Sequence, residues 1–348
     1  MASFKLKSLL LFLLIYFIGA RDSFAQVKTD QIAEKMLVYQ RSYGGWPKAF
    51  AGKKIVYEQD LSDDQIRFIK RDIDAEDATI DNKATSREIR YLAKAYKQTS
   101  NVKYLQAVQK GLDYLLVAQY DNGGWPQYYP AKNLYRGQVT YNDDAMVNVL
   151  NILQDIVEKT NDFDVLDASY TSKSIRAIDK ATQCILNTQV KVNGGLTAWA
   201  AQYDEKSLMP AKARAFEPAS LSSSESVGIV RFLMRLPNPS AEIKTAIFSA
   251  MDWFEKVKIA GFATKNITSA DQPTGKDRIL VSDETSTIWA RFYDIQTFEP
   301  IFIGRDAVIR KRLSEIDNER RVGYAWYGTW PQKLKDHDFA KWKKNNGL

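Results

Sequence analysis

The chain has 348 residues, a formal net charge of +7, one cysteine and one histidine. A single cysteine excludes an internal disulfide, and the lone His337, in a polar tail, gives no basis for a Ser-His-Asp triad or a histidine metal cluster. The modest basic excess is compatible with an acidic substrate, but interspersed acids and the absence of a basic helix face argue against a nucleic-acid partner.

The first 25 residues have the three parts of a secretory signal peptide. Lys5 and Lys7 precede the apolar run LLLFLLIYFIGA, and SFA before Gln26 forms a small-x-small cleavage site. The apolar run is too short to span a membrane, and no later segment is long and apolar enough. We therefore expect a signal peptide at 1–25 and one domain at 26–348. The mature protein is expected to be a monomer, secreted or periplasmic, without stable membrane anchoring.

Three segments repeat one layout, in which a helix with apolar residues three and four apart is followed by a glutamine, a Gly-Gly loop and an aromatic residue. The glutamines and glycine pairs are Gln40 with Gly44-Gly45, Gln119 with Gly123-Gly124, and Gln189 with Gly194-Gly195. Glycine allows positive φ where the chain leaves each helix. A weaker fourth copy, AIFSAMDWFEKVKIAGFAT, keeps the helix and one glycine.

Further helices are expected between these copies, at 84–99, 143–160 and 225–237. Pairs of helices therefore recur about every 70–80 residues, with the aromatic-rich loops at the same point of each pair. This pattern predicts an all-α toroid of helical hairpins whose loops gather at one end. Strands are expected to be few and short, mostly after the Gly-Gly turns, and Cys184 is expected to be a buried thiol on a helix.

Oxygen-bearing side chains cluster where two of these helices begin. TIDNKAT contains Asp81 and Asn82, and TYNDDAM contains Asn142, Asp143 and Asp144. One side-chain oxygen is enough to cap a helix, so two or three in a row exceed that need. Hard oxygen ligands suit Ca²⁺, although the positive end of a helix favours an anion. Capping and calcium binding are both consistent with the pattern.

Several arginines lie among aromatic or acidic neighbours, namely Arg214, Arg291, Arg305, Arg320 and Arg321. Guanidinium groups bind carboxylates through two parallel hydrogen bonds, although each arginine is also consistent with a structural salt bridge. Candidate platforms for sugar rings are Trp46, Trp125, Trp326 and Trp330. Together with calcium-type acids and a secretion signal, these residues favour a polyuronate substrate, which carries one carboxylate per sugar.

Five motifs together resemble the family 10 pectate lyases: NGGWPQYYP, TYNDDAMVNVL, ARAFEPASLSSSES, WARFYDIQTFEPIFIGRD and IDNERRVGYAWYGTWP. The resemblance runs from about Ala33 to Pro331, almost the whole of the expected mature chain. It implies an (α/α)3 toroid and a catalytic domain at 26–348. It also implies calcium-assisted β-elimination of polygalacturonate, with 4,5-unsaturated oligogalacturonates as products.

The resemblance assigns Asp81 and Asp143 to the region of the calcium ion and the +1 subsite, with Asp144 as a further candidate metal ligand. Two positions depart from the family pattern: Lys83 stands where a small residue is expected, and Ser223 where a glycine is usual. A lysine beside Asp81 would either weaken calcium binding or contact a further substrate carboxylate.

By the same resemblance, Arg214 is the Brønsted base, and Arg291 and Arg305 hold substrate carboxylates, with Trp125 as a candidate sugar platform. Free arginine has a pKa above about 12, so Arg214 would act only in a minor deprotonated form. Nearby Ca²⁺ and other cations would favour that form, and Glu217 would oppose it if close. The implied consequence is an alkaline activity optimum.

Two other functions fit parts of the pattern. A glycoside hydrolase with an α/α toroid would use a carboxylate pair, such as Glu217 with Asp143 or Asp144, and would release saturated sugars without calcium. A catalytically silent pectin-binding protein would bind polygalacturonate and form no product, but the intact Arg214, Asp81 and Asp143 argue against it.

Overall fold

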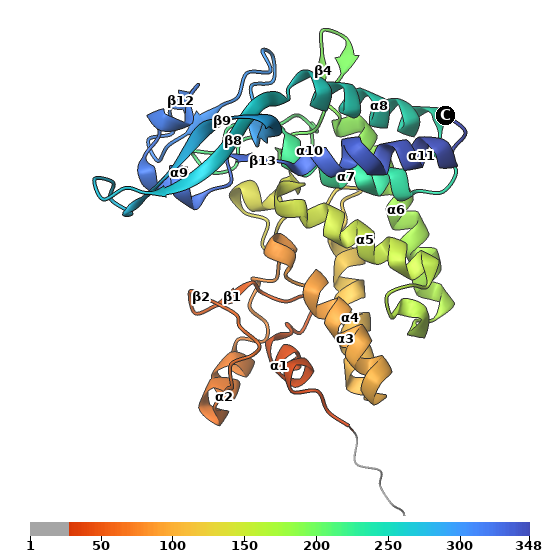
Figure 1. The fold of residues 1–348 in the computed structure, drawn as a ribbon. Helices are drawn as coiled ribbons and strands as arrows, with labels where there is room; N and C mark the ends of the chain where they lie inside the picture. Colours follow the sequence, from red (N-terminus) through yellow and green to blue (C-terminus); the bar gives the residue numbers. More distant parts are fainter. Residues whose placement is uncertain (1–27) are drawn as a thin grey trace, which may run out of the picture.

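The structure, a computed structural model, describes residues 28–348, so the expected signal peptide at 1–25 lies outside the described residues. Three helical hairpins follow one another along the chain (Figure 1). They are α3 (Ser86–Thr99) with α4 (Val102–Ala118), α5 (Ala145–Glu158) with α6 (Ala168–Thr188), and α7 (Ser223–Arg235) with α8 (Ala241–Lys256).

The first helix of each hairpin lies in an inner layer, where α3 contacts α5 and α5 contacts α7. The second helices form an outer layer, in which α6 contacts α8, and α1 (Gln31–Tyr39) packs against α3 and α4. Also helical are α2 (Asp63–Arg71), α9 (Asn318–Gly323), α10 (Trp330–Lys333), η6 (Leu334–Asp338) and α11 (Phe339–Asn345). The predicted toroid of helical hairpins is confirmed, as a mostly helical fold that does not close into a barrel.

The hydrophobic core fills the space between the two helical layers. Leu92, Leu150 and Val230 from the inner helices and Leu115 and Ile185 from the outer ones are completely buried. This burial is what the apolar spacing of three and four residues requires, because it places one stripe of each helix against its neighbours. Cys184 lies in the same core, and burial raises the pKa of its thiol to about 11, so the prediction of a buried thiol is confirmed.

The repeated glutamines connect each loop to the next hairpin. Nε2 of Gln40 donates to the carbonyl of Gly44 in its own loop, at 2.8 Å, and to the carbonyl of Ala107 in α4, at 2.9 Å. Gln119 and Gln189 repeat this arrangement, each with one bond to its own loop and one to the following outer helix. The repeat seen in the sequence is therefore a repeated hydrogen-bond pattern.

A buried tryptophan follows each loop and donates its indole N–H to a carbonyl of the preceding outer helix. Trp46, Trp125 and Trp199 donate to α1, α4 and α6, at 2.7–2.8 Å. Trp289 donates in the same way to the carbonyl of Phe254 in α8, at 2.8 Å. The weak fourth copy is thus a true copy, with an insertion between its helix and its tryptophan.

That insertion is a long antiparallel hairpin of β8 (Ile259–Thr268) and β9 (Lys276–Ala290), which projects from the helical layers (Figure 1). The expectation that all strands would be short is wrong here. Residues of β8 and β9 alternate between more and less exposed positions, so the hairpin is formed by cross-strand pairing and contributes little to the main core. β13 (Tyr327–Gly328) adds a third strand beside β9.

The other strands have two residues each and form pairs that fasten loops. The pairs are β1 (Ala49–Phe50) with β2 (Lys53–Lys54), β3 (Val139–Thr140) with β6 (Gln202–Tyr203), β4 (Lys191–Val192) with β5 (Gly195–Leu196), β7 (Leu221–Ser222) with β10 (Phe292–Tyr293), and β11 (Phe302–Ile303) with β12 (Ile309–Arg310). Short turns are η1 (Asp81–Lys83), η2 (Leu134–Gly137), η3 (Asn142–Asp144), η4 (Phe163–Val165) and η5 (Leu313–Glu315).

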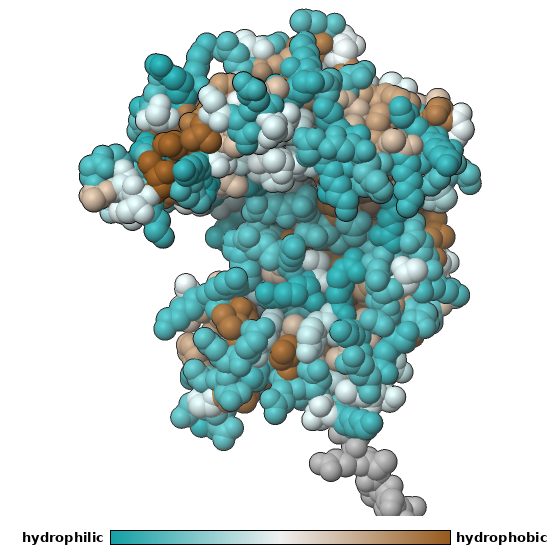
Figure 2. All heavy atoms as spheres, in the orientation of Figure 1, coloured by the Kyte–Doolittle hydropathy of each residue, from teal (hydrophilic) through white to brown (hydrophobic). Residues whose placement is uncertain are grey.

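One face of the molecule is hollowed between the part that carries β1, β2 and α2 and the part that carries the β8–β9 hairpin (Figure 2). Hydrophilic residues line most of this hollow in the view of Figure 2. A polar concave surface of this kind suits a hydrated, charged polymer better than an apolar ligand.

Candidate active site

The candidate site lies where the three inner helices begin. η1 ends two residues before α3, η3 directly precedes α5, and Glu225 stands in the first turn of α7. η3 contacts both η1 and α7, so three segments far apart in the chain meet at one end of the toroid. This is the end at which the sequence predicts that the loops gather.

The acids at these helix starts do not act as ordinary caps. Thr85 is the N-cap of α3 and Asp144 the N-cap of α5, and neither side chain accepts a capping hydrogen bond. Asn82, Asp143 and Asp144 instead have left-handed backbone, with φ of 50°, 53° and 57°. Such conformations cost non-glycine residues on the order of 1 kcal/mol or more and concentrate at functional sites. The capping interpretation is therefore wrong for Asp143 and Asp144.

Arg291 holds two of the acids together. Its Nη2 lies 3.0 Å from Oδ1 of Asp143 and forms an ion pair with the fully buried Glu225, which also accepts a hydrogen bond from Ser222. Burial alone lowers the pKa of Arg291, but the Glu225 and Asp143 carboxylates raise it above its usual value. Ser223 donates its N–H to the carbonyl of Arg291, as a glycine would, and its hydroxyl adds a bond to the carbonyl of Ala290.

The surroundings of Asp144 disfavour its ionised form. Burial first, and then the negative charge of Glu225, raises its pKa to about 6, although Arg291 and Lys83 act in the opposite direction. Its carboxylate has room only because α7 carries Gly228 opposite, where an added Cβ would lie 2.4 Å from Oδ1 of Asp144. A carboxylate in this state gains from any cation that binds beside it.

Asp81 lies on the other side of the cluster and is 3% exposed. Its Oδ2 forms an ion pair with Lys48 and accepts a hydrogen bond from Asn82 at 3.1 Å, while Oδ1 has no partner within the described part of the chain. Lys48 is a site residue that the sequence motifs above do not include. Lys48 follows Trp46-Pro47 just as Gln127 follows Trp125-Pro126. The repeated Trp-Pro pair was therefore the sequence signal that could have identified position 48.

Arg214 lies in the loop between β6 and β7, with its side chain half exposed. Nε donates to Oε2 of Glu217 at 2.8 Å, Nη2 donates to Oε1, and the guanidinium carbon lies 4.9 Å from the centre of the Phe216 ring. The bonds to Glu217 raise the pKa of Arg214. The structure thus places beside the predicted base the very acid that would oppose its deprotonation.

Arg305 reaches the same aromatic ring from another loop. Its guanidinium carbon is 4.8 Å from the centre of the Phe216 ring, and Nε and Nη2 donate to Glu319 at 3.0 and 2.9 Å. Both members of this ion pair are more than half exposed. Arg214 and Arg305, predicted from separate motifs, therefore both pack against the ring of Phe216.

The predicted sugar platforms are mostly misplaced. Trp125 and Trp46 are completely buried and Trp326 is 1% exposed, because their indoles pack in the core and donate to main-chain carbonyls. Trp125 therefore offers no surface to a sugar ring, and its assignment as a substrate-binding residue is wrong in this structure. Of the four tryptophans only Trp330 is partly exposed.

The acids alone do not form a complete metal site. Within residues 28–348 no group of three or more acidic, histidine or cysteine side chains is arranged to hold a metal ion. Asp143 and Asp144 present hard oxygen donors, and the raised pKa of Asp144 marks an unmet negative charge, so the donor chemistry fits Ca²⁺. Calcium takes about six to eight oxygen ligands, more than these two carboxylates supply by themselves.

Two simpler expectations concern the rest of the surface. His337 is exposed, and its one hydrogen bond to a described residue is with the neighbouring Asp338, at 3.1 Å, as its polar surroundings predict. Among the described helices none has the length and apolar character needed to cross a membrane.

Comparison with known proteins places this chain in a family. A family model described as pectic acid lyase matches residues 40–335. The family 10 polysaccharide lyase from Cellvibrio cellulosa is 33% identical, with a TM-score of 0.75 over 89% of this chain and 90% of that one. An aspartate-to-alanine mutant of that lyase, in complex with trigalacturonic acid, is 34% identical, with a TM-score of 0.76 over 89% and 91% of the two chains. No curated protein matched the sequence. The chain belongs to the pectic acid lyase family and is a pectate lyase with the fold of the family 10 polysaccharide lyases.

Proposed function

We propose that this pectate lyase cleaves α-1,4-linked polygalacturonate by calcium-assisted β-elimination, with Arg214 as the base. The observation that carries the proposal is the meeting of arginines and acids at one end of the toroid, with Arg214 and Arg305 on Phe216 and Arg291 against Asp143. The similar lyase bound to trigalacturonic acid supports the substrate class.

The chemistry explains why cations and a base must lie together. β-Elimination removes the proton on C5, next to the uronate carboxylate, and its electron pair forms the C4–C5 double bond as the glycosidic oxygen leaves C4. The developing charge falls on a group that is already anionic. Guanidinium groups paired with that carboxylate stabilise the charge as it forms, which is the electrostatic part of catalysis. Arg291 and Arg305 are the arginines proposed for this task.

Arg214 would accept the C5 proton in its neutral form. The ion pair with Glu217 raises its pKa, so the neutral form requires both high pH and a rearrangement of that pair. Half of the Arg214 side chain is exposed, which leaves it free to move toward a bound polymer. We therefore expect an alkaline activity optimum.

Asp143 and Asp144 are the residues that would hold calcium, with Asp81 facing the same region. Bound there, the ion would supply positive charge to the uronate carboxylate. The chain's own part is to keep two carboxylates on strained backbone and to hold Asp144 where burial and Glu225 disfavour its ionised form. Two carboxylates are few for an ion that takes about six to eight oxygen ligands, so calcium binding in the absence of substrate should be weak.

We also propose that residues 1–25 are removed before Gln26 and that the mature protein is a secreted or periplasmic monomer. Intact mass and N-terminal sequencing of protein recovered from the periplasm and the medium would test the cleavage site. A mass that includes residues 1–25 would contradict it.

The decisive experiment follows the ultraviolet absorbance of the unsaturated product from polygalacturonate at alkaline pH, with calcium and then with chelator. A rise in absorbance that chelator abolishes is expected. New reducing ends without absorbance would indicate a hydrolase, and binding without any product would indicate a silent pectin-binding protein. Loss of the rise in Arg214→Lys, with substrate binding retained, would support the assignment of the base.

A further inference from the structure

The ring of Tyr324 contacts both charged groups of the candidate site. The guanidinium carbon of Arg291, which pairs with the acids at the helix starts, lies 4.9 Å from the centre of this ring. The guanidinium carbon of Arg320 lies 4.8 Å from the same centre and 4.9 Å from the centre of Phe216, the ring that Arg214 also contacts. Tyr324 therefore lies where the acids and the arginines of the site meet.

The aromatic part of Tyr324 is held by other rings. Phe292 lies nearly parallel to it, with ring centres 6.2 Å apart and planes inclined by 18°. Trp326 packs against it with 5.1 Å between the ring centres. Both neighbours belong to the smaller of the two buried apolar clusters. These contacts use only the ring, so a phenylalanine at position 324 would keep them.

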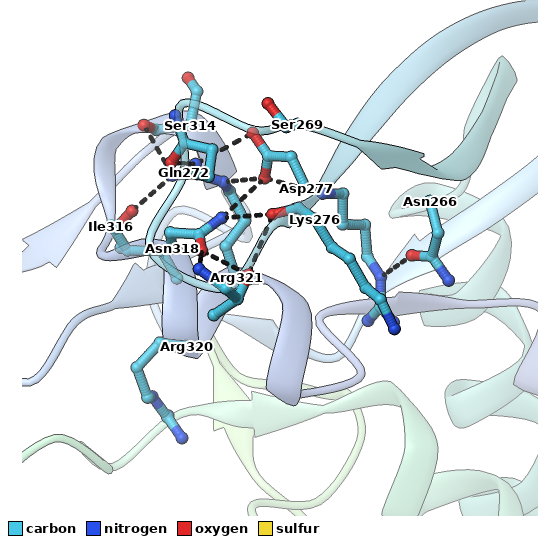
Figure 3. Close-up of polar contacts among 12 residues, drawn as sticks. Asn266, Ser269, Gln272, Lys276, Asp277, Ser314, Ile316, Asn318, Arg320 and Arg321 are labelled. Carbon is cyan, nitrogen blue, oxygen red and sulfur yellow. Dashed lines mark hydrogen bonds and ion pairs between the residues drawn. The ribbon is translucent and has the colours of Figure 1, made fainter.

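The backbone of Tyr324 is fixed by the β8–β9 hairpin. Tyr324 is the C-cap of α9, and its carbonyl accepts a hydrogen bond from Nη1 of Arg278 in β9 at 2.7 Å. α9 is itself fastened to the hairpin by Arg321, whose Nε and Nη2 bind the carboxylate of Asp277 at 2.5 and 3.0 Å (Figure 3). Asn318, on the same helix, adds a further bond to β9. The projecting hairpin thus positions a residue of the site.

The hydroxyl of Tyr324 has no partner in the part of the chain that the structure describes. Its hydrogen bonds there use only the main chain, and its hydroxyl is not among the polar atoms that are sealed from solvent. Buried tyrosine hydroxyls usually have a partner. Tyr293 follows this rule, since its hydroxyl accepts from the N–H of Ala290 at 2.8 Å and donates to the carbonyl of Val257 at 2.9 Å. Tyr324 therefore offers an open O–H donor beside the charges of the site.

This hydroxyl keeps its proton at high pH. Burial raises the pKa of Tyr324 above its ordinary value, and the positive charge of Arg291 opposes this effect. The acids Glu225, Asp143 and Glu217 raise the pKa further. An unperturbed tyrosine has a pKa of about 10, so it would be partly ionised in the alkaline range expected for activity. Tyr324 stays protonated there.

β-Elimination needs a proton donor as well as a base. The glycosidic oxygen that leaves C4 would depart as an alkoxide, which is a poor leaving group, unless it gains a proton as the bond breaks. The roles proposed above for Arg214, Arg291 and Arg305 are proton removal and charge stabilisation, so they supply no such donor. A well-placed acid typically contributes about 10²- to 10⁴-fold to the rate.

We propose that Tyr324 is the general acid of the reaction and donates its hydroxyl proton to the glycosidic oxygen as the C4–O bond breaks. Arg214 takes the C5 proton, and the electron pair of that C–H bond becomes the C4–C5 double bond. The leaving oxygen departs as the neutral anomeric hydroxyl of the other fragment. The tyrosinate then regains a proton from water and Arg214 loses one to water, so both return to their starting forms. The inference rests on the proposed function, because it takes the reaction to be β-elimination.

The test compares two substrates that differ in leaving group, with calcium present. Polygalacturonate expels a sugar hydroxyl, which needs a proton, whereas a galacturonide with 4-nitrophenol bonded to C4 expels 4-nitrophenolate, which does not. We expect Tyr324→Phe to lower kcat on polygalacturonate by about 10²- to 10⁴-fold with little change in KM, and to leave kcat on the nitrophenyl substrate nearly unchanged. Tm should stay at the wild-type value, because the lost hydroxyl has no partner among the described residues.

Tyr327→Phe is the matched control. Tyr327 is the next tyrosine along the chain, packs against Phe302, and has a pKa raised to about 12 by burial alone, without a charged neighbour. Its hydroxyl is therefore outside the charged groups of the site, and Tyr327→Phe should keep the wild-type kcat on both substrates.

An unchanged kcat of Tyr324→Phe on polygalacturonate would overturn the inference and leave the proposed function intact. An equal loss on both substrates, with or without a fall in Tm, would show that Tyr324 only maintains the shape of the site, and would also overturn it. If the wild-type protein forms no unsaturated product from polygalacturonate, the proposed function fails and the role of Tyr324 fails with it.

Discussion

Replacing Asp144 by asparagine should make the protein more stable and less active. Burial, and then the charge of Glu225, raises the pKa of this carboxyl to about 6, so its ionised form is less favourable in the folded chain than in the unfolded one. Asparagine has nearly the same shape and no charge. The substitution therefore removes an unfavourable ionisation without opening a cavity.

The expected gain follows from the size of the pKa shift. A rise from 3.8 to about 6 is roughly two pH units, and at about 1.4 kcal/mol per unit it corresponds to about 3 kcal/mol at neutral pH. The folded pKa lies above the unfolded one, so the ionised carboxyl destabilises the wild-type protein fully above about pH 6 and not at all below about pH 4. We expect Asp144→Asn to gain about 1–3 kcal/mol at pH 7 and nothing near pH 3.5.

Urea unfolding with chelator present, at pH 7 and at about pH 3.5, measures this gain. Asp143→Asn is the matched control, because the Asp143 carboxylate lies 3.0 Å from Arg291 and its removal should lower stability. The reasoning is refuted if Asp144→Asn is no more stable than wild type at pH 7, or if its gain is the same at both pH values. Lyase activity of Asp144→Asn should fall in either case, as expected where function retains an unfavourable charge.

Two further predictions concern the same cluster. Glu217→Gln should shift the pH–rate profile to lower pH, by less than about one unit because the ion pair with Arg214 is partly exposed, whereas Glu319→Gln should leave the profile in place. An unshifted profile in Glu217→Gln would count against Arg214 as the base. Gly228→Ala places a Cβ against Asp144 and should raise the calcium concentration needed for half-maximal activity, measured by calcium titration; an unchanged requirement would exclude Asp144 as a ligand.

The fold was predictable because its determinants are local. Apolar residues three and four apart define each helix, and the glutamine and Gly-Gly pair mark each exit from an outer helix. Gln40 bonds its own loop and the neighbouring helix, and the later copies do the same, so one observation in sequence covers several hairpins. The β8–β9 hairpin was missed because its strands face solvent and lack the apolar alternation of a half-buried strand.

The charged pairs of the site were harder to predict than the residues themselves. Arg291 meets Glu225 and Asp143 across 66 and 148 residues of chain, so only the packing of the hairpins brings them together. The pair of Arg214 and Glu217 is three residues apart and was foreseeable from the sequence. Trp125 was misassigned because an aromatic residue after a glycine turn has the same sequence pattern whether it faces solvent or the core.

The ion pairs of the site also affect its selectivity between the free acid and the methyl ester, because most cations of the site are already paired with a carboxylate of the protein. Arg291 is paired with Glu225, Arg305 with Glu319 and Lys48 with Asp81. A substrate must therefore compete with internal carboxylates for these cations. A neutral methyl ester has no charge with which to compete, whereas a polyuronate supplies one carboxylate per sugar and meets several cations at once. Binding at a paired cation requires a substrate anion to replace the carboxylate of the protein. Paired cations would therefore exclude esterified pectin more strongly than unpaired cations would.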